Sequence, residues 1–186
     1  GFMMMPVAAA VALMGTNSAA ATEAIAALLL YATIYLFMNL GAFAIVAFLR
    51  NSTQSEEIKD YAGLIGRSPV IAVAMTLILV SLVGLPPLAG FWPKLRVLQA
   101  LYEAGGPLLM FVMVAAAINT AISLVYYLRV AKTMCIDSPP DTSRPVQLEL
   151  LATSYVVLVT LPVVLLGFLP DRVAQWTQQA AAGLFG

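Results

Sequence analysis

Charges are clustered along this chain and leave five long spans without Asp, Glu, Lys or Arg. The spans cover residues 1–22, 24–49, 68–93, 104–128 and 150–170. Each is at least as long as the roughly 20 residues that an α-helix needs to cross about 30 Å of hydrocarbon. Lipid offers no hydrogen-bond partner to the backbone, so apolar spans of this length fold as helices. With 62% hydrophobic and 10% charged residues, the sequence predicts an all-α polytopic membrane protein.

We expect a single membrane domain over residues 1–186 with five transmembrane helices, the third of them discontinuous. The expected helices cover 1–15, 24–49, 69–104 with a break near 84–93, 108–131 and 149–169. The tail from Val173 is too short to span a membrane. The chain opens in apolar sequence without an initiator methionine or a basic signal-peptide start. We therefore interpret it as the C-terminal portion of a longer protein.

The third span contains residues that interrupt a helix. They are Gly84, Pro86, Pro87, Gly90 and Pro93. Proline has no amide hydrogen, so Pro86 and Pro87 leave the carbonyls of Leu82 and Val83 without their helical donors. Proline also suits the first turn of a helix, so Pro93 can open a second half-helix that runs to about residue 104. Irregular backbone at membrane depth survives only where protein buries it or water lines it.

Lys94 follows this interruption directly. Counting back some ten residues from Ala104 at ~1.5 Å each places Lys94 about 15 Å deep, near the middle of the membrane. An ionisable side chain costs at least ~2.5 kcal/mol at that depth and usually marks a functional pathway. The pattern favours proton transfer by Lys94. The alternative is a structural cation that caps the freed carbonyls.

Four other polar residues lie within the expected membrane spans. Asn39 is near the middle of its helix, and Asn119 and Ser123 share a helix face with Tyr127 one turn further on. Such side chains most often join helices, at ~1 kcal/mol each or less. The alternative is a polar relay lined by water.

Three further charged residues lie in or beside the expected membrane helices. Glu23 follows Thr22 at an expected helix start, where the helix dipole explains an acid more simply than proton entry does. Arg96 lies about 200° around the helix from Lys94 and so points elsewhere. Three alternatives stay open for Arg96: it lies within a few ångströms of Lys94 and the two charges repel, it extends toward the membrane surface, or it meets an acidic neighbour from another subunit. We expect Glu103 to be interfacial and solvated.

Basic residues in the loops predict the orientation. The loops 50–67 and 129–147 hold three Lys or Arg each, whereas the loops 15–23 and 103–107 hold none. Lys and Arg are retained on the cytoplasmic side, so we expect the C-terminus on the outer side. We also expect a short interfacial helix within residues 51–67, because apolar residues recur there at helical spacing.

The composition argues against several kinds of chemistry. The chain has no histidine and a single cysteine, so the commonest metal ligand is missing and no disulfide can form within it. It carries no Gly-rich phosphate loop and no nucleophile elbow. We expect no cofactor and no metal in this chain, and no nucleic-acid partner.

Four segments together carry a resemblance to a known family. They are Tyr-Leu-Phe-Met-Asn-Leu-Gly-Ala-Phe at 35–43, Arg-Ser-Pro at 67–69, Ser-Leu-Val-Gly-Leu-Pro-Pro-Leu-Ala-Gly-Phe-Trp-Pro-Lys at 81–94, and Tyr-Tyr-Leu-Arg-Val at 126–130. The chain resembles the C-terminal third of the subunit N family of proton-pumping NADH-quinone oxidoreductase. Subunit N is one of the antiporter-like subunits of respiratory complex I. The resemblance covers nearly the whole chain.

The resemblance implies a fourteen-helix subunit, of which this chain supplies the end of the tenth helix and the eleventh to fourteenth. It implies that the twelfth helix is discontinuous and carries a lysine of the central hydrophilic axis, which matches Lys94. Two positions depart from the family pattern, because Pro93 stands where a small residue is more frequent and Arg96 where an aromatic one is.

The resemblance also implies partners and a location. NADH, FMN, iron-sulfur clusters and quinone would belong to partner subunits. The neighbours would be antiporter-like subunit M, small subunits such as K and J, and lipid, in a bacterial cytoplasmic (inner) membrane. The function implied is proton translocation driven by remote quinone reduction. The alternatives are a subunit of a multisubunit sodium/proton antiporter and a structural membrane scaffold.

Overall fold

Every regular element is helical in the computed structural model, which describes residues 1–139 and 149–185. The elements are η1 (Phe2–Met4), α1 (Met5–Leu13), α2 (Ser18–Thr53), η2 (Ile58–Tyr61), α3 (Leu64–Arg67), α4 (Pro69–Val83), α5 (Phe91–Ala104), α6 (Pro107–Cys135), α7 (Leu150–Phe168) and α8 (Pro170–Phe185). The predicted all-α membrane fold is confirmed.

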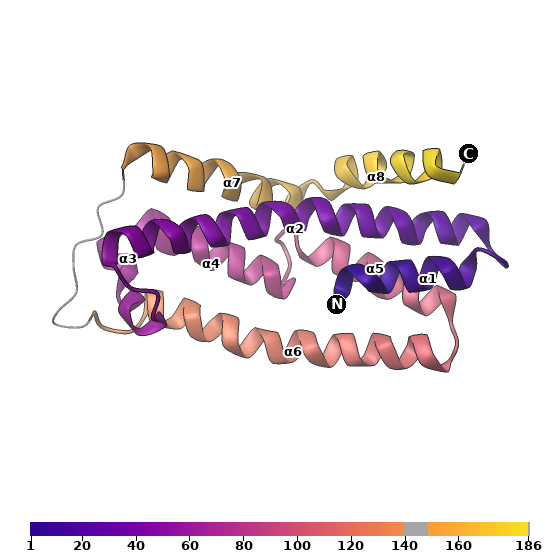
Figure 1. Cartoon of the computed structure of the whole chain (residues 1–186), viewed down its shortest axis with the longest axis horizontal. Helices are drawn as coiled ribbons and strands as arrows, with labels where there is room; N and C mark the ends of the chain where they lie inside the picture. Colours follow the sequence, from indigo (N-terminus) through magenta and orange to yellow (C-terminus); the bar gives the residue numbers. More distant parts are fainter. Residues whose placement is uncertain (140–148, 186) are drawn as a thin grey trace.

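The helices form an elongated bundle (Figure 1). α2 and α6 each run along most of its length, whereas α4 and α5 follow one another end to end, as α7 and α8 do. Among the described residues, α2, α6 and α7 are long and apolar enough to cross a membrane alone, and α4 belongs to the shorter apolar helices. Fifteen residues in α4 span only about 22 Å. Crossing at this position therefore requires both α4 and α5.

Several boundaries differ from the expected ones. α2 begins at Ser18, because the side chain of Asn17 caps the helix by accepting from Ala20 N at 3.1 Å. Glu23 therefore lies in the second turn, so its interpretation as a first-turn acid is wrong. α5 begins at Phe91 rather than at Pro93, with Gly90 as its N-cap.

Two apolar clusters hold the two halves of the broken helix. α4 packs on α2 and α7, where Ile78 approaches Gly41 so closely that a Cβ on this glycine would lie 2.6 Å from Ile78 Cδ1. α5 packs on α1 and α2 through the buried residues Val97 and Leu101. Each half is thus held by a different set of neighbours. The break lies where the cluster around α4 meets the cluster around α5.

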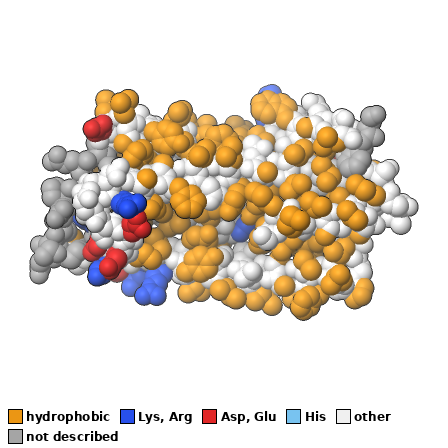
Figure 2. Space-filling view, in the orientation of Figure 1, with side chains coloured by type: hydrophobic (Ala, Val, Ile, Leu, Met, Phe, Trp, Pro, Cys, Tyr) orange, Lys and Arg blue, Asp and Glu red, His pale blue; other side chains and the backbone are white. Residues whose placement is uncertain are grey.

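The connection between α2 and α4 is not the single interfacial helix that the spacing predicts. It consists of η2 and α3, and Gly63 N donates to Thr133 O of α6 at 3.2 Å. Arg67 holds the turn by donating from Nη2 to the carbonyls of Asp60 and Ala62, both at 2.9 Å. Charged side chains gather at this end of the bundle (Figure 2). We call it the charged end.

The residues after Pro170 form a helix that the sequence did not predict. α8 lies along α2, against which it buries Val173, Thr177 and Ala181 at successive i, i+4 positions. Its opposite face is exposed, and the Trp176 side chain is 66% accessible. A stripe at this spacing is the pattern of a helix that packs along one side.

Candidate functional site at the broken helix

Gly84 ends α4 in the left-handed conformation, with φ at 88°, and its amide donates to the carbonyls of Val80 and Ser81. A side chain is strained at this φ. A Cβ on Gly84 would also lie 2.8 Å from Cδ of Lys94. Glycine is therefore needed here both to stop the helix and to let the lysine stem pass.

Lys94 fills the break from the first turn of α5. Its Nζ donates to the carbonyl oxygen of Leu82 at 2.8 Å and to that of Val83 at 2.9 Å. These are the two carbonyls that Pro86 and Pro87 deprive of their helical donors. The lysine is half-buried. Its amine caps the two freed carbonyls, as the alternative interpretation of Lys94 as a structural cation predicts.

The ring of Phe2 provides a third contact for the same ammonium group. Nζ lies 4.9 Å from the ring centroid, within the range of a cation–π interaction. Nζ forms no ion pair with any described residue. All of its identified partners are therefore neutral.

The two ends of the break touch each other directly. The amide of Gly90 donates to Oγ of the buried Ser81 at 3.0 Å. A Cβ on Gly90 would lie 1.8 Å from the carbonyl oxygen of Ser81. Any larger residue at position 90 would therefore force the backbone to move. Pro93 is buried one turn further on. The motif thus packs α4 and α5 backbone to backbone.

Helix α7 closes the site from the other side. Ala89 N donates to Val163 O at 3.1 Å, and Trp92 Nε1 donates to Gly167 O at 2.8 Å. A Cβ on Gly167 would lie 2.1 Å from the carbonyl oxygen of Pro87. The irregular backbone is thereby covered by protein, as membrane depth requires.

Sequence reasoning missed four residues of this site. Ser81 and Trp92 stand inside the motif at 81–94 but were not singled out as site residues. Gly167 carried a weaker signal, because a glycine inside an apolar helix often marks close backbone approach. Phe2 gave no signal, since only the tertiary fold brings it to Lys94.

The other polar residues are not joined to Lys94 by any described hydrogen bond. Asn39 Nδ2 donates to Tyr35 O at 2.8 Å and Ser123 Oγ donates to Thr120 O at 2.7 Å, both within their own helices. Asn119 is exposed. The ring of Tyr127 packs against the cluster around α2 and α4. A relay through these side chains stays a prediction.

Arg96 has an acidic neighbour within this chain, whereas an acidic neighbour from another subunit was one of the alternatives that the sequence left open. Its Nη1 lies 3.8 Å from Oε2 of Glu23 on α2. Gln178 of α8 donates to both carboxylate oxygens of Glu23, at 3.1 and 3.2 Å. Beside the pair lies a hollow of about 190 Å³, which Gln99 and the exposed Glu103 also line.

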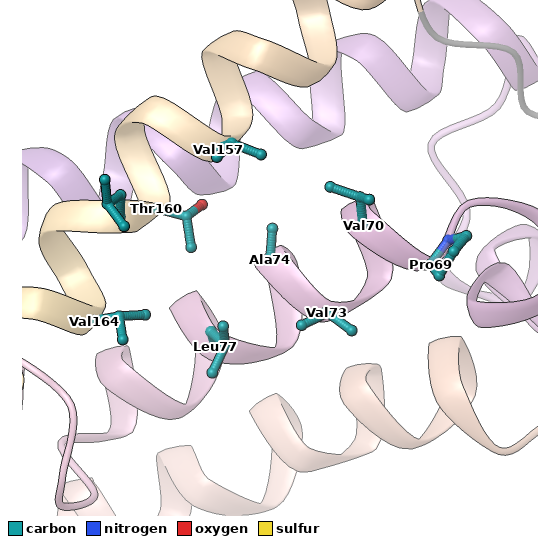
Figure 3. A pocket seen from close by; sticks show the side chains of 9 residues that line it. Pro69, Val70, Val73, Ala74, Leu77, Val157, Thr160 and Val164 are labelled. Carbon is teal, nitrogen blue, oxygen red and sulfur yellow. The ribbon is translucent and has the colours of Figure 1, made fainter.

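A larger groove between α4 and α7 has a different character (Figure 3). Its volume is about 450 Å³ and its lining is almost wholly apolar, with Val70 and Ala74 on α4 pointing toward α7, where Val157 lies. Thr160 supplies the only hydroxyl, which has no hydrogen-bond partner among the described residues. The groove offers no group that could carry a proton.

Comparison with known proteins supplies the family. The profile of the family described as "NADH:quinone oxidoreductase/Mrp antiporter, TM" matches residues 7–120, well over half of the chain. The chain belongs to this family. Within the NADH:quinone oxidoreductase/Mrp antiporter family, the match covers the whole break and Lys94, together with the first half of α6.

Relatives in the family are named as subunit N. NADH-quinone oxidoreductase subunit N of Desulforamulus reducens is 39% identical over 162 residues, which are 87% of this chain and 33% of that protein. Subunit N of Desulfitobacterium hafniense is 34% identical over 185 residues, which are 99% of this chain and 36% of that protein. The predicted resemblance to subunit N is confirmed. The chain spans about a third of the length of these relatives.

The fold recurs in a solved structure. A chain of respiratory complex I from Thermus thermophilus with bound aureothin superposes with a TM-score of 0.70 and 23% identity, covering 94% of this chain and 42% of that one. At this identity the match supports the fold alone. It shows that the overall helical arrangement recurs in a chain of a solved respiratory complex I.

Proposed function

We propose that this chain is the proton-translocating C-terminal part of a membrane subunit of NADH-quinone oxidoreductase, with Lys94 as its proton carrier. The observation that carries the proposal is the pair of contacts from Lys94 Nζ to the carbonyls of Leu82 and Val83. These contacts place an ionisable amine in the break of a membrane helix. Ionisable groups at such depth are kept for transport more often than for packing.

The hydrogen-bond count of the amine supports reversible proton transfer. A protonated lysine has three N–H donors, and the two carbonyls of the break accept two of them. A neutral amine keeps two N–H groups and gains a lone pair. Both carbonyls therefore stay satisfied when the third proton leaves, and the lone pair is ready for the next one. Protonation can change without unfolding the break.

The neutral surroundings of Lys94 also support reversible proton transfer. Lys94 has carbonyls and the Phe2 ring as its identified neighbours, so deprotonation leaves no buried carboxylate without a counterion. A charge that moves in a neighbouring helix or subunit changes the electrostatic energy of the ammonium strongly, because the surroundings screen it weakly. Lys94 would release its proton when a positive charge approaches and regain one when that charge withdraws.

The energy for this step would come from outside the chain. We place NADH, FMN, iron-sulfur clusters and quinone in partner subunits, and subunit M and small subunits such as K and J among the neighbours in the membrane. We place the chain in a bacterial cytoplasmic membrane. The alternation of loops with and without Lys or Arg supports an orientation with the charged end inside and the C-terminus outside.

Three substitutions of Lys94 in the assembled oxidoreductase test the proposal. Lys94→Gln keeps two N–H donors for the carbonyls but cannot titrate, and Lys94→Arg keeps charge and donors but does not release a proton. Lys94→Met removes the donors as well. We expect proton pumping per electron to fall in all three, with assembly best preserved in the Gln and Arg variants. A Gln variant that assembles and pumps at the wild-type ratio would show that Lys94 only caps the break.

Two alternative functions predict different experimental results. The family description includes Mrp antiporters, and sodium-dependent exchange without NADH-linked activity would place the chain in such a complex. The other alternative is a structural membrane scaffold in which Lys94 only caps the two carbonyls of the break. Copurification with flavin and iron-sulfur subunits would support the oxidoreductase.

A further inference from the structure

Helix α5 carries two cations on different faces. Lys94 reaches back to the end of α4, and Arg96 reaches across to Glu23 on α2. Two residues correspond to about 200° of rotation and 3 Å of rise. A rotation or a shift of α5 along its axis therefore changes the Lys94 contacts and the Arg96 contact together.

Glu23 is the point at which three helices meet. Its carboxylate accepts from Gln178 of α8 through both oxygens while it faces Arg96 of α5. α2 itself is the long, continuous helix of the bundle (Figure 1). Glu23 thus connects half-helix α5 with α2 and α8.

The strength of the pair suits a contact that opens and closes. The side chain of Arg96 is 44% exposed and that of Glu23 is 50% exposed, with 3.8 Å between the charged atoms. Exposed pairs at this distance add little stability. The adjoining hollow, which Gln99 and Glu103 also line, gives the two charges room to separate. A rigid packing contact would instead be buried.

We infer that Glu23 and Arg96 form an ion-pair latch that positions half-helix α5, and through it the amine of Lys94, against the end of α4. The inference rests on the proposed function of Lys94. Neither residue exchanges the transported proton. Glu23 and Arg96 are positioning residues, and the latch sets how Lys94 meets its carbonyl partners.

Charge variants in the assembled oxidoreductase test the latch. Glu23→Gln and Arg96→Gln each remove one charge and should lower proton uptake per electron at least two-fold per assembled complex. The double variant Glu23→Arg with Arg96→Glu restores an opposite pair and should recover most of the loss. A loss of packing alone would reduce the amount of complex, and the exchange of charges would not restore the pumping ratio.

Glu103→Gln is the matched control, because it removes a carboxylate from the same hollow without breaking the pair. Its pumping ratio should match wild type. Normal ratios in both single variants, or no recovery in the double variant, would overturn the latch even if Lys94→Gln fails to pump. If Lys94→Gln pumps normally, the proposed function fails instead, which separates the two claims.

Discussion

The amine of Lys94 donates to the carbonyl of Leu82, which is the carbonyl that Pro86 leaves without a helical donor. The same amine serves Val83, whose donor is lost at Pro87. One side chain therefore replaces two backbone donors. The residue that the sequence suggests for transport is also the residue that makes the break stable.

Lys94→Met should destabilise the protein more than Lys94→Gln. Methionine leaves two buried carbonyls unsatisfied, at about 1–3 kcal/mol each, whereas the glutamine amide can still donate. Thermal unfolding of the two variants in detergent would measure the difference. Equal melting temperatures would contradict a capping role of the lysine.

Gly90→Ala should prevent normal packing of the break. The added Cβ would lie 1.8 Å from Ser81 O, so α4 and α5 would have to separate. We expect a loss of more than ~3 kcal/mol, as for other severe overpacking. Gly66→Ala is the control, since no atom lies within 4 Å of a Cβ there. Yield of folded protein after size-exclusion chromatography would compare them, and a well-folded Gly90→Ala variant would refute the close contact.

Gly167→Ala should weaken the contact of α7 with the break, because the new Cβ would lie 2.1 Å from Pro87 O. Trp92→Phe removes the hydrogen bond to the Gly167 carbonyl together with part of the ring and should cost at least about 1 kcal/mol. Gly183→Ala meets no atom within 4 Å and should behave as wild type. Protease resistance of the three variants would rank them, and a Gly167→Ala variant as resistant as Gly183→Ala would speak against this contact.

Arg67→Met should loosen the charged end, since Arg67 Nη2 holds the carbonyls of Asp60 and Ala62. Hydrogen bonds from a charged donor contribute about 1.5–3 kcal/mol. Arg50→Met breaks only an ion pair whose side chains are 67% and 61% exposed and should have little effect. Hydrogen exchange of residues 58–67 would show the difference. Equal protection in both variants would count against the role of Arg67.

The proposed orientation predicts which side of the membrane single cysteines face. In a background with Cys135→Ser, Gln179→Cys on α8 should react with an impermeant maleimide added outside right-side-out vesicles. Asn51→Cys at the charged end should react only after the vesicles are opened. Both positions are exposed. The reverse pattern would place the C-terminus on the inner side.

The sequence by itself determined the helical membrane fold, the place of the break and the candidate lysine. These follow from local chemistry: charge-free length, the missing proline amides, and the cost of a charge in lipid. The helix ends were less well determined. α2 begins earlier than expected because Asn17 caps it. α8 was not predicted because its apolar face is stabilised only by packing against α2.

Only the tertiary structure decided which groups complete the site. Phe2 and Gly167 lie far from Lys94 along the chain, yet one contacts its amine and the other touches the break. Glu23 and Arg96 meet for the same reason. Such contacts depend on how helices pack, and no local pattern encodes the distance between residues on different helices. The five charge-free spans required helices. Packing between those helices decided which side chains contact the break between α4 and α5.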